Sequence, residues 1–141
     1  MSESRKLLAF LALALLLALG ACAASGDNFA PLATDGGKGA IYVYTLDDNY
    51  DLQTAPKVSL DGVVAGRLKP RGHLRFPVEP GKHSVRIDSS VYLIPFKDGV
   101  EVDVKPGGSA YVRIDAFRVK KLLVMPADLA QDEIQATRGN D

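Results

Sequence analysis

Short stretches of apolar and β-branched residues recur along the chain from residue 40 onward, with turn residues between them. Ile41 to Thr45 form the densest of these stretches, and residues 100–104 alternate strictly between apolar and acidic side chains. Such runs predict β-strands, and strict alternation predicts a strand with one buried face and one wet face. The predicted strands cover residues 41–45, 58–60, 63–65, 74–78, 85–87, 92–96, 100–104, 110–114 and 122–125.

The connections between these stretches carry turn signals. Asp61-Gly62 separates residues 58–60 from residues 63–65 and predicts a two-residue hairpin, because both central positions of a type I′ turn need a positive φ. Residues 98–99 and 106–108 predict further turns.

Residues 79–82, Glu-Pro-Gly-Lys, predict a second hairpin, between residues 74–78 and 85–87. In the register that collects the apolar side chains on one face, Phe76 faces Val85. The same register sets Arg75 directly opposite Arg86.

The spacing of apolar residues along the chain changes after Pro126 from that of a strand to that of a helix. Asp128 is the expected N-cap of a short helix that runs to about Thr137, with Ala130, Ile134 and Thr137 on one face. Seven to nine short strands followed by one helix predict a mainly β fold: an antiparallel β-sandwich of immunoglobulin or transthyretin-like type with a short C-terminal helix. A small closed barrel is the alternative.

The first residues of the chain have the pattern of a bacterial export signal. Arg5 and Lys6 precede an unbroken apolar run of 13 residues, 7–19, whereas a membrane-spanning helix needs about 20. Gly20-Ala21 directly before Cys22, the only cysteine, resembles the lipobox of bacterial lipoproteins. That resemblance implies that the Cys22 thiol carries a diacylglycerol and that the preceding peptide is removed. A plain signal peptide with an incidental cysteine is the alternative.

These patterns divide the chain into four parts. Residues 1–21 are the expected signal peptide, and residues 22–39, rich in Ala, Gly, Ser and Asp, the expected lipidated flexible tether. A tether of that length would span roughly 20–25 Å. Residues 40–137 are the expected β-sandwich domain, and residues 138–141 a disordered tail.

The charge balance and the cysteine content limit the partners that the protein can bind and the ways in which its fold can be stabilised. The chain has 17 basic and 17 acidic residues. Without residues 1–21 the counts are 15 and 16, a balance that argues against nucleic acid as a partner. With Cys22 lipidated, no disulfide can form within the chain, so the core alone must hold the fold.

The sequence offers little for catalysis. His83 is expected beside the second hairpin turn and His73 in a solvated loop, too far apart to share a metal. Ser109 lacks the glycine of a nucleophile elbow two positions on. Glu101 and Asp103 fall on the wet face of one strand, where carboxylates keep ordinary acidity. We therefore expect a protein without catalytic residues.

One acidic stretch partly matches a calcium-binding loop. Asp47, Asn49 and Asp51 have the spacing of the first three ligands. Leu52 stands where the loop needs glycine, and Val58 where it needs a bidentate acid. We expect an acidic connection between strands and no metal or other cofactor.

The second predicted hairpin is rich in basic residues. If Arg75 faces Arg86, an anion between them would relieve their repulsion. The anion is either internal, with Asp88 as the first choice, or external. In the external case Arg75 and Arg86, with Arg71 at the rim, would bind a phosphate or carboxylate of the cell envelope. The basic residues concerned are Arg67, Lys69, Arg71, Arg75, Lys82 and Arg86.

The order of several motifs resembles domain-of-unknown-function family 2846, small exported bacterial lipoproteins. The resemblance covers nearly all of residues 40–137 and implies a β-rich fold and an envelope location, but no reaction. The matching motifs are residues 41–44, 58–62, 66–68, 76–85 and 107–112 and the C-terminal helix.

Together these observations predict a non-catalytic, lipid-anchored module that contacts an envelope protein, peptidoglycan or anionic lipid. Ala23, rather than Asp, follows the cysteine, which in resembling lipoproteins of diderm bacteria implies the inner leaflet of the outer membrane, facing the periplasm. The alternative is a small-ligand carrier or sensor that holds an apolar guest against Tyr42, Tyr44, Tyr92 or Phe96.

Overall fold

The computed structural model of this chain consists mainly of β-strands. It describes residues 3, 6, 24, 26–48, 55–91, 94–116 and 118–140. Its elements in chain order are β1 (Gly39–Tyr44), β2 (Lys57–Leu60), β3 (Val63–Arg67), β4 (Gly72–Val78), β5 (Gly81–Val91), β6 (Ile94–Val104), β7 (Ser109–Asp115), β8 (Lys121–Met125), α2 (Ala127–Ile134) and β9 (Arg138–Gly139).

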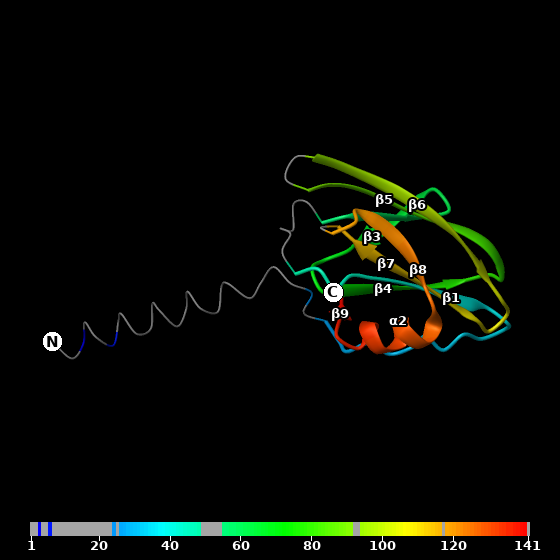
Figure 1. Cartoon of the computed structure of the whole chain (residues 1–141). Coiled ribbons are helices and arrows are strands. Elements are labelled where there is room, and N and C mark those ends of the chain that lie inside the picture. The colour runs from blue at the N-terminus through cyan, green and yellow to red at the C-terminus, as the bar shows by residue number, and fades with distance from the viewer. Residues whose placement is uncertain are drawn as a thin grey trace.

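The strands form two packed sheets (Figure 1). The first sheet has the order β8-β7-β1-β4-β9 and the second the order β3-β2-β5-β6. All pairs of strands are antiparallel except β1 with β7 and β4 with β9, which are parallel. The predicted β-sandwich with a short C-terminal helix is confirmed. The described strands do not join into the single closed sheet of the barrel alternative.

Strand β1 is buried on both faces because a third layer covers the first sheet. Ile41 and Val43 point into the core between the two sheets. Tyr42 and Tyr44 point the other way, into a second apolar cluster that includes Ile134 of α2. Because side chains alternate between the two faces of a strand, β1 contributes side chains to two separate cores.

The hairpin at Asp61-Gly62 is confirmed. Leu60 pairs with Val63, and the two turn residues have φ values of 51° and 85°. Positive φ at both positions is the requirement of a type I′ turn.

The second predicted hairpin is wrong. Strand β4 pairs with β1 and β9, whereas β5 pairs with β2 and β6, so Glu79 and Pro80 link two different sheets. Leu74, Phe76, Val85 and Ile87 do face one core, but from opposite sides. Apolar alternation identifies the buried face of a strand and not its neighbour, which is why the wrong pairing satisfied the same pattern.

The turn expected at residues 98–99 is also wrong. Asp98 and Gly99 lie inside β6 and pair with Ile87 and Arg86 of β5. The turn at residues 106–108 is confirmed, since the Gly108 amide donates to Lys105 O over 2.8 Å before β7 begins.

The prediction of a flexible tether over residues 22–39 is wrong for the described part of that segment. The Ala24 amide donates to Pro70 O over 2.9 Å. Phe29 is buried, with its ring centroid 5.1 Å from that of Tyr42 and 5.3 Å from that of His73, both edge-on. Phe29 covers the outer face of the first sheet together with Leu32 and with Ala130 and Ile134 of α2, and composition does not show this.

The prediction of a disordered tail at residues 138–141 is wrong up to Asn140. Arg138 and Gly139 form β9 and pair with Gly72 and His73 of β4. The Asn140 side-chain oxygen accepts the Lys69 amide at 2.7 Å. Asp141 lies outside the described residues.

The predicted helix is confirmed with different bounds, since it ends at Ile134 rather than at about Thr137. Helix α2 begins at Ala127, its N-cap is Pro126 without a side-chain bond, and Asp128 lies in the first turn. Ala130, Ile134 and Thr137 are all buried, as their spacing predicts.

Candidate functional site

The predicted lipidation site, Cys22, lies outside the described residues. The sequence places it two positions before Ala24, whose amide is bonded to Pro70 O. Figure 1 shows the N-terminal segment of the domain running beside β9 and the C-terminus at one end of the sandwich. Within the part of the chain that the structure describes, no helix is long and apolar enough to cross a bilayer.

The three arginines predicted to share an anion are not brought together. Arg75 pairs with Tyr42 of β1 and donates from Nη1 to Ala30 O at 2.9 Å, on the face covered by the N-terminal segment. Arg86 lies between Val85 and Ile87, which face the core, so it projects from the outer face of the other sheet. Two sheets, packed about 10 Å apart, separate the two guanidinium groups.

Arg71 lies at a third place. It precedes β4 with a φ of 52°, and its Nη1 donates to Leu46 O at 3.1 Å. The prediction that Arg71, Arg75 and Arg86 share an anion site is therefore wrong, because that site required a hairpin that does not form.

Arg86 lines an open groove whose lining also includes the acidic residues Asp88 and Asp98. Its pairing partners are Ser59 and Gly99, and a Cβ built on Gly99 would lie 3.0 Å from Arg86 Cγ. The groove has a volume of about 550 Å³. Asp88, the predicted internal partner, lies 3.4 Å from Lys97 Nζ in an exposed ion pair.

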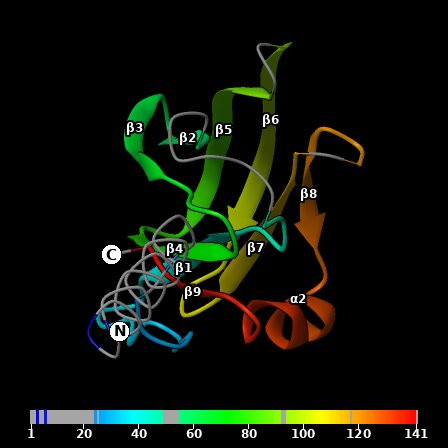
Figure 2. The ribbon, with the colours of Figure 1, turned by 90° about the vertical axis from the view of Figure 1, so that its left-hand side faces the viewer.

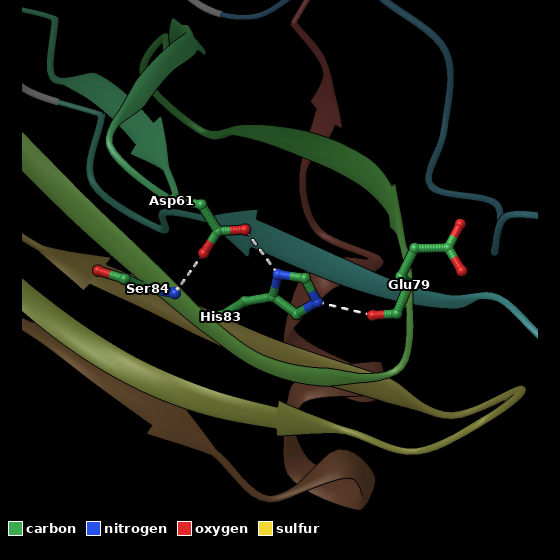
Figure 3. A network of polar contacts seen from close by, with 4 residues as sticks. All are labelled: Asp61, Glu79, His83 and Ser84. Carbon is green, nitrogen blue, oxygen red and sulfur yellow. Dashed lines mark hydrogen bonds and ion pairs between the residues drawn. The ribbon is translucent and has the colours of Figure 1, made fainter.

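A polar network surrounds His83 (Figure 3). Its Nδ1 lies 2.7 Å from Asp61 Oδ2 and its Nε2 lies 2.6 Å from Glu79 O. The other carboxylate oxygen of Asp61 accepts the Ser84 amide at 2.8 Å. Asp61 belongs to the β2–β3 turn and Glu79 to the link between the sheets, so the network joins two connections of the fold.

The geometry favours the imidazolium form of His83. A carbonyl oxygen can only accept, so Nε2 must carry a hydrogen, and the carboxylate of Asp61 calls for a second hydrogen on Nδ1. The hydrogen bond to Asp61 accordingly raises the pKa of His83, and the Glu79 carbonyl adds to it. The hydrogen bond from His83 in turn lowers the pKa of Asp61. With both ring nitrogens occupied, His83 has no lone pair for acid–base catalysis.

A second network ties α2 to the first sheet. Glu133 Oε2 accepts the Tyr44 hydroxyl at 2.6 Å, and its Oε1 lies 2.6 Å from Arg113 Nη1. Burial and then the hydrogen bond to Glu133 raise the pKa of Tyr44. Both carboxylate oxygens of Glu133 are used, which makes this a structural link. The sequence showed no signal for it, since Tyr44 and Glu133 are 89 positions apart.

His73 was expected in a solvated loop, and this is wrong. It is 3% exposed within β4, and its Nδ1 lies 2.8 Å from Thr137 Oγ1. The Thr137 hydroxyl donates to Ile134 O at 2.6 Å, so it accepts from Nδ1–H of His73. The imidazole thus joins β4 to the end of α2.

The acidic stretch has a structural role in its described part. Asp47 Oδ2 accepts the Ala116 amide at 2.8 Å, and burial raises the pKa of that carboxyl. Asn49 and Asp51, the other predicted calcium ligands, lie outside the described residues. Among the described residues no group of three or more His, Cys, Asp or Glu side chains could hold a metal ion.

The aromatic residues considered for a ligand carrier belong to the two cores. Tyr42 and Tyr44 are 1% and 0% exposed, and Phe96 is 4% exposed. The Tyr42 hydroxyl accepts the Leu32 amide at 2.9 Å. Tyr92 lies outside the described residues. The three described aromatics therefore offer no open apolar wall to a guest.

No family model matches the chain, and no curated protein sequence is significantly similar to it. The resemblance to domain-of-unknown-function family 2846 therefore stays a prediction.

Proposed function

We propose that this chain is a lipoprotein of the bacterial cell envelope whose β-sandwich is a non-catalytic binding module. In this proposal Cys22 carries the lipid and residues 1–21 are removed. The module contacts an envelope protein or an anionic component such as peptidoglycan or lipid. Because Ala23 follows the cysteine, the location is the inner leaflet of the outer membrane, facing the periplasm, in a diderm organism.

The observation that carries the proposal is the position of the domain boundary. The lipobox predicts cleavage before Cys22 from local sequence alone. The first described hydrogen bond of the domain, Ala24 N to Pro70 O, occurs two residues after that point. Cleavage at Cys22 would release the folded part almost without surplus chain, which fits an exported domain that begins at its anchor.

The polar networks support a non-catalytic role. The Nδ1 and Nε2 atoms of His83 and both carboxylate oxygens of Glu133 are committed to bonds that hold the fold together. A general base must offer a free lone pair to substrate, and these groups do not.

Mass spectrometry of the purified protein tests the anchor. We expect a mature chain that starts at an acylated Cys22 and fractionates with membranes. Cys22→Ala should abolish acylation and membrane association, whereas the control Asp27→Ala should change neither. A Cys22→Ala protein that is still membrane-bound would contradict the proposal.

Two further measurements test location and activity. Ala23→Asp should move the protein from outer to inner membrane fractions, and an unchanged location would contradict the outer-membrane assignment. Turnover in hydrolase or metal-dependent assays that His83→Ala or Ser109→Ala abolishes would contradict the non-catalytic role.

A further inference from the structure

Strand β3 forms an open edge of the second sheet within the described structure. The sheet has the order β3-β2-β5-β6, and among the described strands β3 pairs with β2 alone. Figure 2 shows these four strands in that order, with β3 on the outer side. An edge strand presents backbone amides and carbonyls that can pair with another chain. The outer side of β3 is therefore a candidate interface.

The described chain covers the other edges of the two sheets. Gly139 of β9 bonds the N-terminal segment through the Gly26 amide and the Asp27 carbonyl. The edge strands β6 and β8 contact each other, and the Leu122 amide of β8 donates to Asp98 Oδ2 of β6 at 2.8 Å. The open edge at β3 is therefore an exception in this fold.

The side chains of β3 lack the usual protection of an open edge. Natural edge strands carry charges or proline that prevent pairing with another chain. This strand reads Val-Val-Ala-Gly-Arg, with no charge before its last residue, Arg67. Val63 and Val64 are 70% and 61% exposed, more than any other large apolar side chain among the described residues. An apolar strand at an open edge favours pairing with another chain.

The geometry of the hairpin directs the backbone of Val64 toward the open edge. Leu60 and Val63 flank the two-residue turn, and the next pair along the ladder is Ser59 with Val64. Hydrogen-bonded and non-hydrogen-bonded pairs alternate along an antiparallel ladder, and the pair that flanks a two-residue turn is a hydrogen-bonded one. The amide and carbonyl of Val64 therefore point away from β2, where a further strand could bond to both.

A bulge limits how far a partner strand could extend along β3. The register between β2 and β3 shifts after Val64, so that Ala65 is left without a partner residue on β2 and Gly66 pairs with Val58. A bulge bends its strand and interrupts the ladder. We therefore expect a short contact centred on Val64, which is typical of a weak and reversible association.

The charges at the two ends of β3 favour a second copy of this chain as the partner. Asp61 precedes the strand and Arg67 ends it. If two copies pair antiparallel about a two-fold axis at Val64, Asp61 lies opposite Arg67 of the second copy. In the same register Val63 lies opposite Ala65. Opposite charges and apolar side chains that face each other across a strand pair are both favourable, whereas like charges are not.

We propose that two copies of this chain associate through antiparallel pairing of their β3 strands, which joins their second sheets into one continuous sheet. A two-fold axis makes such an interface self-complementary, because each copy supplies the same residues. The inference goes beyond the proposed function and does not require the lipid on Cys22. Anchoring to one membrane would raise the local concentration of the copies and so favour a short contact.

Thiol crosslinking of the full-length protein in cells, with a short membrane-permeant bismaleimide, tests the pairing. Val64→Cys places a thiol on the two-fold axis, where the Cα atoms of a hydrogen-bonded pair are about 5.5 Å apart. Val124→Cys is the matched control, since Val124 is 53% exposed and lies on the edge strand β8 of the other sheet. The unsubstituted chain controls for Cys22, whose thiol an acyl group would block.

We expect a crosslinked dimer from Val64→Cys, mapped by mass spectrometry to the two introduced thiols, and loss of that dimer in Val124→Cys. A folded Val64→Cys protein that does not crosslink to itself, or that crosslinks only to a different protein, overturns the inference and leaves the proposed function intact. Crosslinking through Cys22 in the unsubstituted chain would instead contradict the proposed function, because it requires a free thiol there.

The antiparallel register is tested in the Val64→Cys background. Arg67→Glu sets two carboxylates opposite each other and should lower the crosslinked fraction several-fold. The control Arg86→Glu makes the same change of charge on β5, inside the same sheet, and should leave that fraction unchanged. Thermal unfolding verifies that each variant folds. Equal crosslinking of a folded Arg67→Glu variant and its parent would disprove the pairing of Arg67 with Asp61, and with it this interface.

Discussion

His83 and Asp61 form a clamp whose strength depends on two opposite charges. The pKa of His83 is raised, so its contribution to stability is fully present below the unfolded value, about 6.5, and is lost as the pH rises through the folded pKa. The pKa of Asp61 is lowered, so its contribution is present above the unfolded value, about 4, and is lost as the pH falls through the folded pKa. The clamp is therefore strongest from about pH 4 to 6.5.

We predict that His83→Gln destabilises the protein more at pH 5.5 than at pH 8.5. Asp61 is 49% exposed, so water screens the pair and the difference should stay below about 1 kcal/mol. Urea unfolding at the two pH values, with Lys82→Gln as control, measures it. The same loss of stability at both pH values would contradict an imidazolium clamp.

The Tyr44–Glu133–Arg113 network carries the second prediction. Tyr44→Phe removes one hydrogen bond and should cost about 1 kcal/mol of unfolding free energy. Glu133→Gln leaves the part-buried Arg113 without its ion pair and should cost about 2 kcal/mol.

Denaturant unfolding of the two single variants and of the double variant measures the coupling between Tyr44 and Glu133. Gln131→Ala, also on α2 but exposed, should change stability by less than about 0.5 kcal/mol. Additive effects of Tyr44→Phe and Glu133→Gln would show that the two side chains do not interact.

At the scale of elements, the N-terminal segment acts as part of the outer layer of the first sheet. Phe29 packs edge-on against both Tyr42 and His73. The Arg75 side chain, which projects from β4, donates from Nη1 to the Ala30 carbonyl. We predict that Phe29→Ala lowers the unfolding free energy by about 3 kcal/mol, because it opens a cavity over the sheet.

Thermal or urea unfolding tests this prediction, with the exposed Pro31→Ala as the control. A flexible tether would tolerate both substitutions equally. Unchanged stability of Phe29→Ala would therefore restore the tether interpretation for this segment.

At the scale of the whole molecule, the described N-terminal and C-terminal segments of the domain pair with each other at one edge of the first sheet. Gly26 N donates to Gly139 O at 3.1 Å and Gly139 N to Asp27 O at 2.7 Å, beside β4. Each terminal segment thus supplies hydrogen-bond partners that the other needs. Gly26 and Gly139 meet at one place although more than 110 residues separate them in sequence.

We predict that deletion of residues 138–141 lowers the melting temperature and also speeds hydrogen exchange at the Gly26 amide, which loses its acceptor. The Lys38 amide, bonded to Asp35 O at the far end, is the internal control and should keep its protection relative to global unfolding. An unchanged melting temperature would indicate that β9 contributes nothing to the fold.

The amino-acid sequence determined the features that depend on near neighbours. It located most strands, the positive φ values at Asp61 and Gly62, and the buried stripe of Ala130, Ile134 and Thr137 on and after α2. The periodicity of apolar residues and the geometry of turns depend on only a few neighbouring residues. They can therefore be predicted without knowing which segments pack together in the fold. The predicted export signal and the proposed lipidation of Cys22 likewise rest on local sequence alone.

Only the tertiary structure decided which elements meet. The alternation in β4 and β5 fits either a hairpin or two facing sheets, because it records burial and not pairing. Because of that ambiguity, the sequence-based prediction placed Arg75 and Arg86 side by side. In the structure they lie on opposite outer faces of the sandwich. The ordered N-terminal segment, β9 and the Tyr44–Glu133 bond depend on partners tens of residues away, and no local pattern specifies them.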